Sequence, residues 1–421
     1  MNTHRRPVVA GLLVIGLIGV VPAAGVATAA ASRRHQSCPA AESLVPGTAW
    51  HHHKLANGVT LAAGVAKDSR GTVNMHVLRV DLTQPRVHAV PLEHHVANRS
   101  PLSSLAHGHP HLVAATNTSY FDFVTGAPTV PLIVSGSAQV MSDSHETVVG
   151  IGMSHRVEAG DVSLSGTVTA GKQSQPLHQV NEPFPGSGLG LYDGRWGPAR
   201  VPGNWNTVNR EVVNGKIASG TVSSRNASVP SNGFLLQARG RTATDWLRGI
   251  SPGTQVSVNK SFKTTARSPF RQAYGVGVQL VAHPGVARTG FSCDSSNTRT
   301  PARTAIGWAN GGRTMVIVVV ADHPDTSEHG LDQDQMSKLM AQLGVSQAYS
   351  LDGSGSTELL ARSNGRSSLA LQNYPADGAE RPMPVGLGIA VAPVRKHAAK
   401  AGHRRTHHRR SHGHHRHHKH R

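Results

Sequence analysis

The most regular pattern of apolar and polar positions lies near the C-terminal end of the sequence. A continuous β-branched run at 314–320 is typical of a strand buried on both faces. In the segment LDQDQMSKLMAQLG, apolar residues recur at spacings of three and four, which predicts a helix with one apolar face. This face contains Met336, Leu339, Met340 and Leu343. Asp332 and Gln335 have the spacing of a capping box, and Gly344 is suited to end the helix. The segment QAYSL then predicts a second short strand, ending at Leu351.

A strand, a helix and a second strand in this order predict a βαβ unit. Its crossover makes the two strands parallel, and parallel strands end at the same edge of a sheet. Asp322 follows the first strand and Asp352 follows the second. We therefore expect both carboxylates at one rim of the sheet, where open α/β sheets place their ligands.

The rest of the body has short strand patterns separated by Gly, Pro, Asn and Ser. Alternation is visible at 73–82, and an apolar strand at 112–115 leads into a polar turn at Asn117. The stretch 160–263 is rich in turn residues and has weak strand signals, and no repeat of fixed period is present. These patterns predict an α+β fold over residues 61–393: a large mixed β-sheet domain with the βαβ unit near its C-terminal end and few helices.

The first 31 residues have the organisation of a secretory signal peptide. Two arginines precede an apolar run at 7–21, and Ala27-Thr28-Ala29 offers an A-x-A cleavage site. A transmembrane anchor is the alternative, but a spanning helix needs about 20 apolar residues and Pro22 cuts this run short. We expect export without a transmembrane anchor, a short N-terminal segment at 32–60, and a location outside the cell or at the cell wall.

The formal net charge of +19 is concentrated at the C-terminal end of the chain. Ten of the 42 Lys and Arg and ten of the 28 His lie in residues 395–421, which contain no acidic residue. Without this tail and the two signal arginines, 30 basic residues face 23 acidic ones. Because 394–421 has almost no apolar residues, a disordered basic His-rich tail is predicted.

Several uses of such a tail are open. They are electrostatic adhesion to anionic cell-wall polymer, nucleic acid or lipid, and loose metal capture by imidazole. No pattern of a folded nucleic-acid module accompanies the basic run, so specific DNA or RNA recognition is not expected.

Only two cysteines occur, Cys38 and Cys293. In an oxidising compartment they can pair and link the mature N-terminus to the second half of the domain. Two unpaired thiols are the alternative.

The loop LDGSGST follows the second predicted strand. Gly353 and Gly355 allow backbone amides to approach a ligand, and Ser354, Ser356 and Thr357 add hydroxyl groups. The loop is not a nucleophile elbow, because no glycine stands two residues before Ser354, and it is not a P-loop, because no Lys follows the glycines. A tight turn without function is the alternative.

Five motifs occur in a specific order along the chain. They are RTAIGW (303–308), VVVADHPDTSEHG, the capped helix, LDGSGST, and NYPADGAERPMPVGLGIAV (373–391). Together they resemble the phosphodiester glycosidase family, whose best-known member uncovers mannose 6-phosphate by removing N-acetylglucosamine. Upstream, AATNTSYFDFVTGAP is similar to the family's Asn-initiated aromatic turn, and AYGVGVQLV to its glycine-rich strand entry. The resemblance spans roughly residues 73–391.

The chain departs from the family pattern at several glycines. The family has Asn-Gly-Gly where Asn117-Thr118-Ser119 stands, a third consecutive glycine at Ser354, and Asp-Gly at Asp322-His323. The polar residues that would touch substrate are retained. The changes therefore affect mostly the room around the backbone.

The resemblance implies cleavage of a sugar-1-phosphodiester. Glycosidases meet the oxocarbenium character of this reaction with two carboxylates in acid, base or nucleophile roles. Asp352 and Asp322 are the candidate catalytic pair, and Glu380 and Glu358 are reserves. Two arginines, Arg303 and Arg381, are candidates for a phosphate clamp.

Four further residues are candidates for binding substrate. Asn117 is the expected partner of a sugar hydroxyl, and Gly353, Gly355 and Ser356 are expected to contact substrate in the loop. Other interpretations stay open. Arg381 can pair with a surface carboxylate, and Asp122 is typical of a turn.

The sequence therefore predicts a secreted hydrolase that cleaves glycosyl-phosphate linkages in envelope or extracellular glycans. The alternative is a catalytically degenerate carbohydrate- or cell-wall-binding module of the same fold. The expected partners are a glycan or sugar-phosphate substrate and an anionic cell-wall polymer bound through the tail. We assign no cofactor and no metal ligands.

Overall fold

The computed structural model describes residues 50–220, 227–291, 300–362 and 368–393. The predicted signal peptide, both cysteines of the Cys38–Cys293 hypothesis and the basic tail lie outside the described residues. Within the described part of the chain, no helix is long and apolar enough to cross a membrane.

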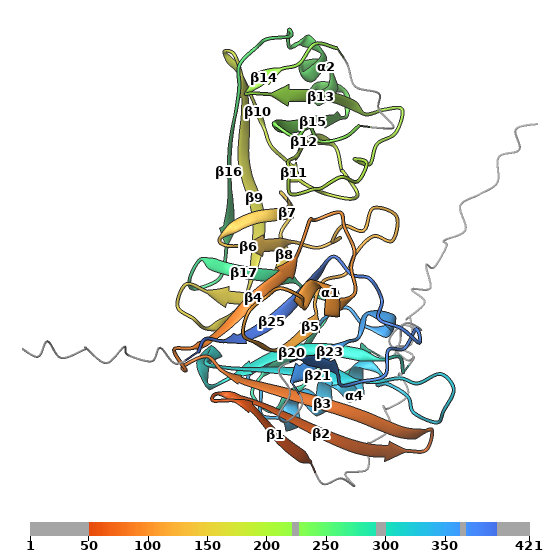
Figure 1. Ribbon diagram of the computed structural model, residues 1–421. Coiled ribbons are helices and arrows are strands. Elements are labelled where there is room, and N and C mark those ends of the chain that lie inside the picture. Colours follow the sequence, from red (N-terminus) through yellow and green to blue (C-terminus); the bar gives the residue numbers. More distant parts are fainter. Residues whose placement is uncertain (1–49, 221–226, 292–299, 363–367, 394–421) are drawn as a thin grey trace, which may run out of the picture. The chain divides into compact units, whose positions relative to one another are not determined.

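The strands form three sheets (Figure 1). The first has the order β1-β2-β3-β21-β20-β22-β18-β19. Its strands are β1 (His51–Ala56), β2 (Val59–Asp68), β3 (Gly71–Asp81), β18 (Gln279–His283), β19 (Val286–Ala287), β20 (Arg303–Ala309), β21 (Thr314–Val320) and β22 (Gln347–Ser350). The second sheet has the order β24-β23-β5-β25-β4. Its strands are β4 (Val87–Glu93), β5 (Leu112–Asn117), β23 (Leu359–Arg362), β24 (Leu369–Leu371) and β25 (Val385–Val391).

The third sheet is the largest, with twelve strands. They are β6 (Leu132–Val134), β7 (Ser137–Ser142), β8 (Glu146–Gly152), β9 (Val157–Ala170), β10 (Gln173–Pro176), β11 (Gln179–Val180), β12 (Gly188–Tyr192), β13 (Val208–Val213), β14 (Lys216–Ile217), β15 (Gly233–Arg239), β16 (Val256–Thr264) and β17 (Phe270–Gly275). The α-helices of the described residues are α1 (Leu102–Ala106), α2 (Arg241–Gly249) and α4 (Gln333–Gln342). An α+β fold with a large β-sheet component and few helices was predicted, and this part of the prediction is confirmed.

The stretch 160–263 forms far more regular sheet than its turn-rich sequence suggests. β9 and β16 pair antiparallel in unbroken register from Val162–Thr264 to Ala170–Val256, and Figure 1 shows them as two long strands side by side. Many of their residues are Ser, Thr, Gly and Lys, and much of their surface is exposed or half-buried. In β9, Val162, Leu164, Val168 and Ala170 nevertheless alternate with polar residues and lie in one core cluster. The sequence analysis treated this stretch as turn-rich and missed the alternation.

β21 is buried on both faces, as its sequence predicted. On one face, Met315, Ile317 and Val319 belong to a core cluster that includes residues of the second sheet. On the other face, Val316, Val318 and Val320 pack in a cluster with Met336, Leu339 and Met340 of α4. The first sheet therefore lies between α4 and the second sheet.

The strand–helix–strand segment is present, but the predicted parallel pair is not confirmed. β20 lies between β21 and β22 and is antiparallel to both. The sequence analysis did not assign β20 as a strand, although Asn310-Gly311 between two apolar runs is a hairpin signal, and β20 forms a hairpin with β21 through the turn at Asn310–Gly312. β21 and β22 still run in the same direction. Arg303 pairs with Val320 and Ala305 with Ser350, so both strands end at the edge where β20 begins.

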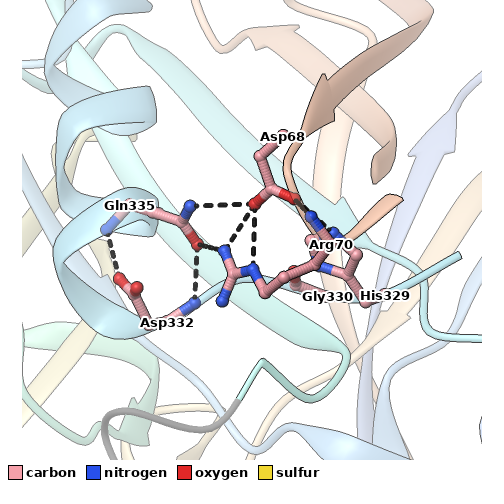
Figure 2. Close-up of polar contacts among 6 residues, drawn as sticks. All are labelled: Asp68, Arg70, His329, Gly330, Asp332 and Gln335. Carbon is pink, nitrogen blue, oxygen red and sulfur yellow. Dashed lines mark hydrogen bonds and ion pairs between the residues drawn. The ribbon is translucent and has the colours of Figure 1, made fainter. Parts of the chain in front are cut away.

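The start of α4 is held by the predicted capping box and by a buried carboxylate. Gln335 N donates to Asp332 Oδ1 at 2.7 Å, and Asp332 N donates to Gln335 Oε1 at 3.2 Å. Figure 2 shows Asp68, at the end of β2, beside Gln335, Arg70 and His329. The Asp68 side chain is fully buried, and its carboxylate accepts hydrogen bonds from Arg70 Nε at 3.1 Å and Gln335 Nε2 at 3.4 Å. These contacts fix α4 against the β2–β3 turn.

Candidate functional site

A pocket of about 280 Å³ lies beside the edge where β22 ends and β20 begins. Its polar lining includes Arg303, Asp352, Ser354 and Arg381. Its apolar lining includes Tyr120, Phe121 and Phe123. Four segments that are distant in the sequence therefore meet here: the turn after β5, the start of β20, the loop after β22 and the segment before β25.

Asp352 is the carboxylate of this pocket. Its Oδ1 accepts a hydrogen bond from Gly353 N at 2.9 Å, and its backbone N donates to Thr118 O at 3.0 Å. Burial raises the pKa of Asp352 to about 6, although the Ser356 hydroxyl, the Gly353 amide and the charge of Arg381 lower it. The group is therefore mostly ionised at neutral pH and gains a proton in mildly acidic solution.

Asn117 is buried, and both ends of its amide contact the protein. Its Nδ2 donates to the backbone oxygen of Asp352 at 2.6 Å. Its Oδ1 accepts from Thr304 Oγ1 at 2.8 Å and from Glu358 N at 3.3 Å. Asn117 thus connects the end of β5 to the loop that carries Asp352, and these contacts fix its orientation.

Arg303, the first residue of β20, lines the pocket from a largely buried position. Its Nε donates to Leu331 O at 2.8 Å, one residue before the cap of α4. Burial lowers the pKa of Arg303, while the charges of Tyr120 and Asp332 act in the opposite direction. The capping network of α4 therefore also positions this arginine.

Arg381 is held by an acidic partner that the sequence analysis did not name. Its Nε and Nη2 donate to the two carboxylate oxygens of Asp377 at 2.7 and 3.0 Å. Its Nη1 contacts Ser356 Oγ at 3.4 Å, and its guanidinium lies 5.5 Å from the centre of the Phe123 ring. The expectation that Arg381 could pair with a carboxylate is thus met, and the same guanidinium lines the pocket.

The loop after β22 brings its backbone close to these charges. A side chain at Gly355 would collide with the guanidinium of Arg381 and the carboxylate of Asp377, so both of these side chains would have to move. Ser354, at the position where the family has glycine, adopts a left-handed backbone with φ of 54°. The loop thus keeps a conformation that favours glycine although the residue is serine. Ser356 is buried, and its hydroxyl lies between Asp352 and Arg381.

Asp322 leaves β21 at the same edge of the sheet but is not among the residues lining the pocket. Burial raises its pKa, while the charges of His329 and His323 and a hydrogen bond from the Ala302 amide lower it. The oxygen of the same Ala302 accepts from Ser354 N at 2.7 Å. Asp322 and the Asp352 loop therefore flank the residue that precedes β20.

The two reserve carboxylates have mainly structural contacts. Glu358 is completely buried, and its Oε1 accepts from Arg381 N at 2.7 Å. Burial raises the pKa of Glu358 to about 8. Glu380 accepts hydrogen bonds from the amide and hydroxyl of Ser103 at the start of α1.

Sequence reasoning missed the aromatic wall and Asp377. Tyr120, Phe121 and Phe123 were seen only as part of an aromatic turn, and Asp377 lies four residues before Arg381. Phe123 is 61% exposed, which no local pattern distinguishes from an ordinary loop residue.

Residues 208–390 match the family model described as phosphodiester glycosidase. The matched segment belongs to the phosphodiester glycosidase family. It contains Asp322, Asp352, both pocket arginines and the LDGSGST loop. Asn117 and the aromatic turn lie before it and join the phosphodiester glycosidase segment through the contacts described above. No curated protein matches the sequence.

Solved structures are similar to this chain, and two of those described here share its fold at TM-scores above 0.5. A hypothetical protein from Synechocystis has 19% identity and a TM-score of 0.66, covering 84% of this chain and 69% of that one. A candidate exported protein from Burkholderia pseudomallei has 15% identity and a TM-score of 0.65, covering 84% and 99%. The autoinhibited catalytic domain of zebrafish N-acetylglucosamine-1-phosphodiester alpha-N-acetylglucosaminidase has 16% identity and a TM-score of 0.43, covering 84% and 87%.

Proposed function

We propose that this protein is an exported hydrolase that cleaves sugar-1-phosphodiester linkages in envelope or extracellular glycans. The observation that carries the proposal is the partly buried carboxylate of Asp352, with its pKa raised to about 6, in one pocket with Arg303 and Arg381. The family match supports phosphodiester glycosidase-like activity. The export proposal rests on the signal-like sequence of the first 31 residues.

Asp352 is the proposed base or nucleophile. Breaking the bond between the sugar C1 and the phosphate oxygen develops positive charge on the sugar, which a nearby carboxylate stabilises. With a pKa of about 6, Asp352 is ionised at neutral pH but retains more basicity than an exposed aspartate. A phosphate leaving group needs little protonation, so a strong general acid is not required.

Arg303 and Arg381 are proposed to hold the phosphate. Arginine is suited to this role because its planar fork stays charged and matches phosphate geometry. Both residues line the pocket that contains Asp352. The backbone amides around Gly353 and Gly355, together with the Ser356 hydroxyl, are proposed to complete the binding site.

We propose different roles for Asn117 and Asp322. Asn117 is a positioning residue, because its amide holds the backbone of Asp352 and the start of β23. Asp322 remains the proposed second carboxylate, since it flanks Ala302 on the same sheet edge as the Asp352 loop.

The non-catalytic alternative is less favoured. The altered glycines, such as the one replaced by Ser354, favour this alternative. The retained Asp352, Arg303 and Arg381 in one pocket, with the pKa of Asp352 raised by burial, favour the enzyme.

Release of free sugar tests the proposal directly. The purified full chain is incubated with a panel of sugar-1-phosphodiesters, beside an Asp352→Asn variant. We expect turnover by the wild type and a fall in kcat of about 1,000-fold or more in the variant, with KM little changed, because the amide keeps the shape but not the charge. Equal turnover by both proteins, or no sugar release from any member of the panel, would contradict the proposal.

A further inference from the structure

Asp377 occupies most of the hydrogen-bonding capacity of the pocket arginine. Two of the three guanidinium nitrogens of Arg381 donate to its carboxylate, Nε at 2.7 Å and Nη2 at 3.0 Å. The third nitrogen, Nη1, makes the longer contact of 3.4 Å to Ser356 Oγ. A phosphate in the pocket would therefore meet an arginine whose charge is already partly balanced.

The ion pair between Arg381 and Asp377 is close to the loop after β22. It lies against Gly355, where any side chain would overlap both Arg381 and Asp377. Gly355 belongs to the loop that starts at Asp352, and Arg381 lowers the pKa of Asp352 through its charge. The Asp377 carboxylate thus lies against the same loop that carries the proposed catalytic carboxylate.

The charges at the pocket largely balance one another, so an added negative charge on the ligand is not offset by a surplus of positive charge. Arg303 and Arg381 bring two positive charges, whereas Asp352 and Asp377 bring two negative ones when ionised. A phosphodiester carries one negative charge, while a phosphomonoester carries about 1.5 to 2 near pH 7. The energy of repulsion by Asp377 grows in proportion to the charge of the bound phosphate.

We propose that Asp377 is a specificity-determining residue that makes the pocket bind a phosphodiester in preference to a phosphomonoester. This inference rests on the proposed function, because it deepens the assignment of the same site.

The preference for a diester would also favour release of the phosphomonoester product. Water adds to the sugar C1, the bond from C1 to the phosphate oxygen breaks, and the products are a free sugar and a phosphomonoester. The monoester then releases a second proton to solvent near neutral pH. Asp377 repels this product more than the substrate, so the product leaves.

Asp377 can be changed without removing a buried group. Its side chain is 45% exposed and that of Arg381 is 20% exposed. An ion pair that reaches solvent contributes little to stability. Asp377→Asn should therefore fold, and its thermal unfolding midpoint should stay near that of the wild type.

Binding of two matched probes to the full chain tests the proposal at pH 8 by calorimetry. The probes are phenyl phosphate, a dianionic monoester, and methyl phenyl phosphate, a monoanionic diester. For Asp377→Asn we expect affinity to rise roughly threefold for the diester and about tenfold for the monoester, because the dianion gains twice the electrostatic energy. The wild-type preference for the diester should shrink accordingly.

Two variants serve as controls. Asp245→Asn makes the same charge change on α2. Asp245 also forms an ion pair with an arginine four residues away, since its Oδ2 lies 3.7 Å from Arg241 Nε. Neither probe should respond to it. Asp377→Glu keeps the charge and should keep the preference for the diester.

Equal changes for the two probes, or weaker binding of both by Asp377→Asn, would overturn the proposal, since Asp377 would then only position Arg381. Sugar release by the wild type is measured in parallel. If probe selectivity changes as expected but the wild type releases no sugar, the role of Asp377 in selecting the ligand charge is supported and the proposed hydrolase function is contradicted.

Discussion

Two opposing influences act on the pKa of the Asp352 carboxylate. Burial favours the protonated form, while Ser356, the Gly353 amide and Arg381 favour the ionised form, and burial prevails with a pKa of about 6. The hydrogen bond from Asn117 to its backbone fixes the residue but does not reach the carboxylate. The group therefore titrates in mildly acidic solution.

This titration predicts the acidic limb of the pH profile. If the ionised form of Asp352 acts, log kcat/KM should fall with a slope near one as pH drops below about 6. The limb should be absent from any residual activity of Asp352→Asn. A profile that stays flat down to pH 4.5 would contradict the role of Asp352.

The same pKa predicts how stability changes. Because the carboxyl pKa is raised in the folded state, ionised Asp352 destabilises the fold above about pH 6. This cost vanishes as the pH falls to 3.8, the ordinary pKa of the group, because Asp352 is then protonated in the folded state. At pH 7, Asp352→Asn should unfold with a free energy on the order of 1–2 kcal/mol higher than the wild type. Denaturant titrations should show a smaller difference in unfolding free energy between variant and wild type at pH 4 than at pH 7.

Ser354 is the second residue whose backbone predicts an effect. A left-handed conformation costs an L-residue roughly 1–2 kcal/mol, whereas glycine adopts it readily. With φ of 54°, Ser354→Gly should raise the free energy of unfolding by about 0.5–1 kcal/mol, after the extra chain entropy of the unfolded glycine is subtracted. Ser251→Gly, at an exposed loop serine without positive φ, is the control and should not stabilise. A loss of stability in Ser354→Gly would show that the serine hydroxyl matters more than the backbone.

At the scale of elements, α4 depends on a residue from the other end of the chain. Asp68 at the end of β2 binds Arg70, His329 and Gln335, and Gln335 is also the partner of the Asp332 cap (Figure 2). Leu331, next to this cap, receives the hydrogen bond of Arg303. A contact network in the first sheet thus reaches one of the pocket arginines.

Asp68→Asn tests this network. Burial raises the pKa of Asp68, but the hydrogen bonds of Arg70 and the charge of His329 outweigh it and hold the pKa below its ordinary value. Such a group stabilises the fold above about pH 4, and the contribution is lost as pH falls further. The variant should lose about 2 kcal/mol at pH 7, measured by denaturant unfolding, and the difference should narrow at pH 3. Asp143→Asn, at an exposed turn, should leave stability unchanged at both pH values.

For the whole molecule, the charge distribution separates the body from the C-terminal tail. We expect a chain that ends at Pro393 to retain turnover of a small sugar phosphodiester, because the pocket residues all lie before that position. Binding to anionic cell-wall material should drop in this variant, and binding by the full chain should weaken with added salt as charges are screened. A large loss of turnover on the small substrate would show that the tail contributes to the pocket.

The sequence determined those features that depend on short-range patterns. The doubly buried strand β21, the capping box of α4 and Gly344 at its end follow from neighbouring residues, and all are present. The motif order indicated the family, and the strand–helix–strand order indicated that Asp322 and Asp352 follow strands that end at one sheet edge.

Only the tertiary structure decided which distant segments become neighbours. It inserted β20 between β21 and β22, and it paired the polar strands β9 and β16. It brought the Asn117 amide to within hydrogen-bonding distance of the Asp352 backbone oxygen, and it paired the Asp377 carboxylate with the guanidinium of Arg381. Pairing partners depend on contacts across long stretches of chain, which local periodicity does not specify. For the same reason, the pKa of Asp352 follows from its packed surroundings and not from its motif.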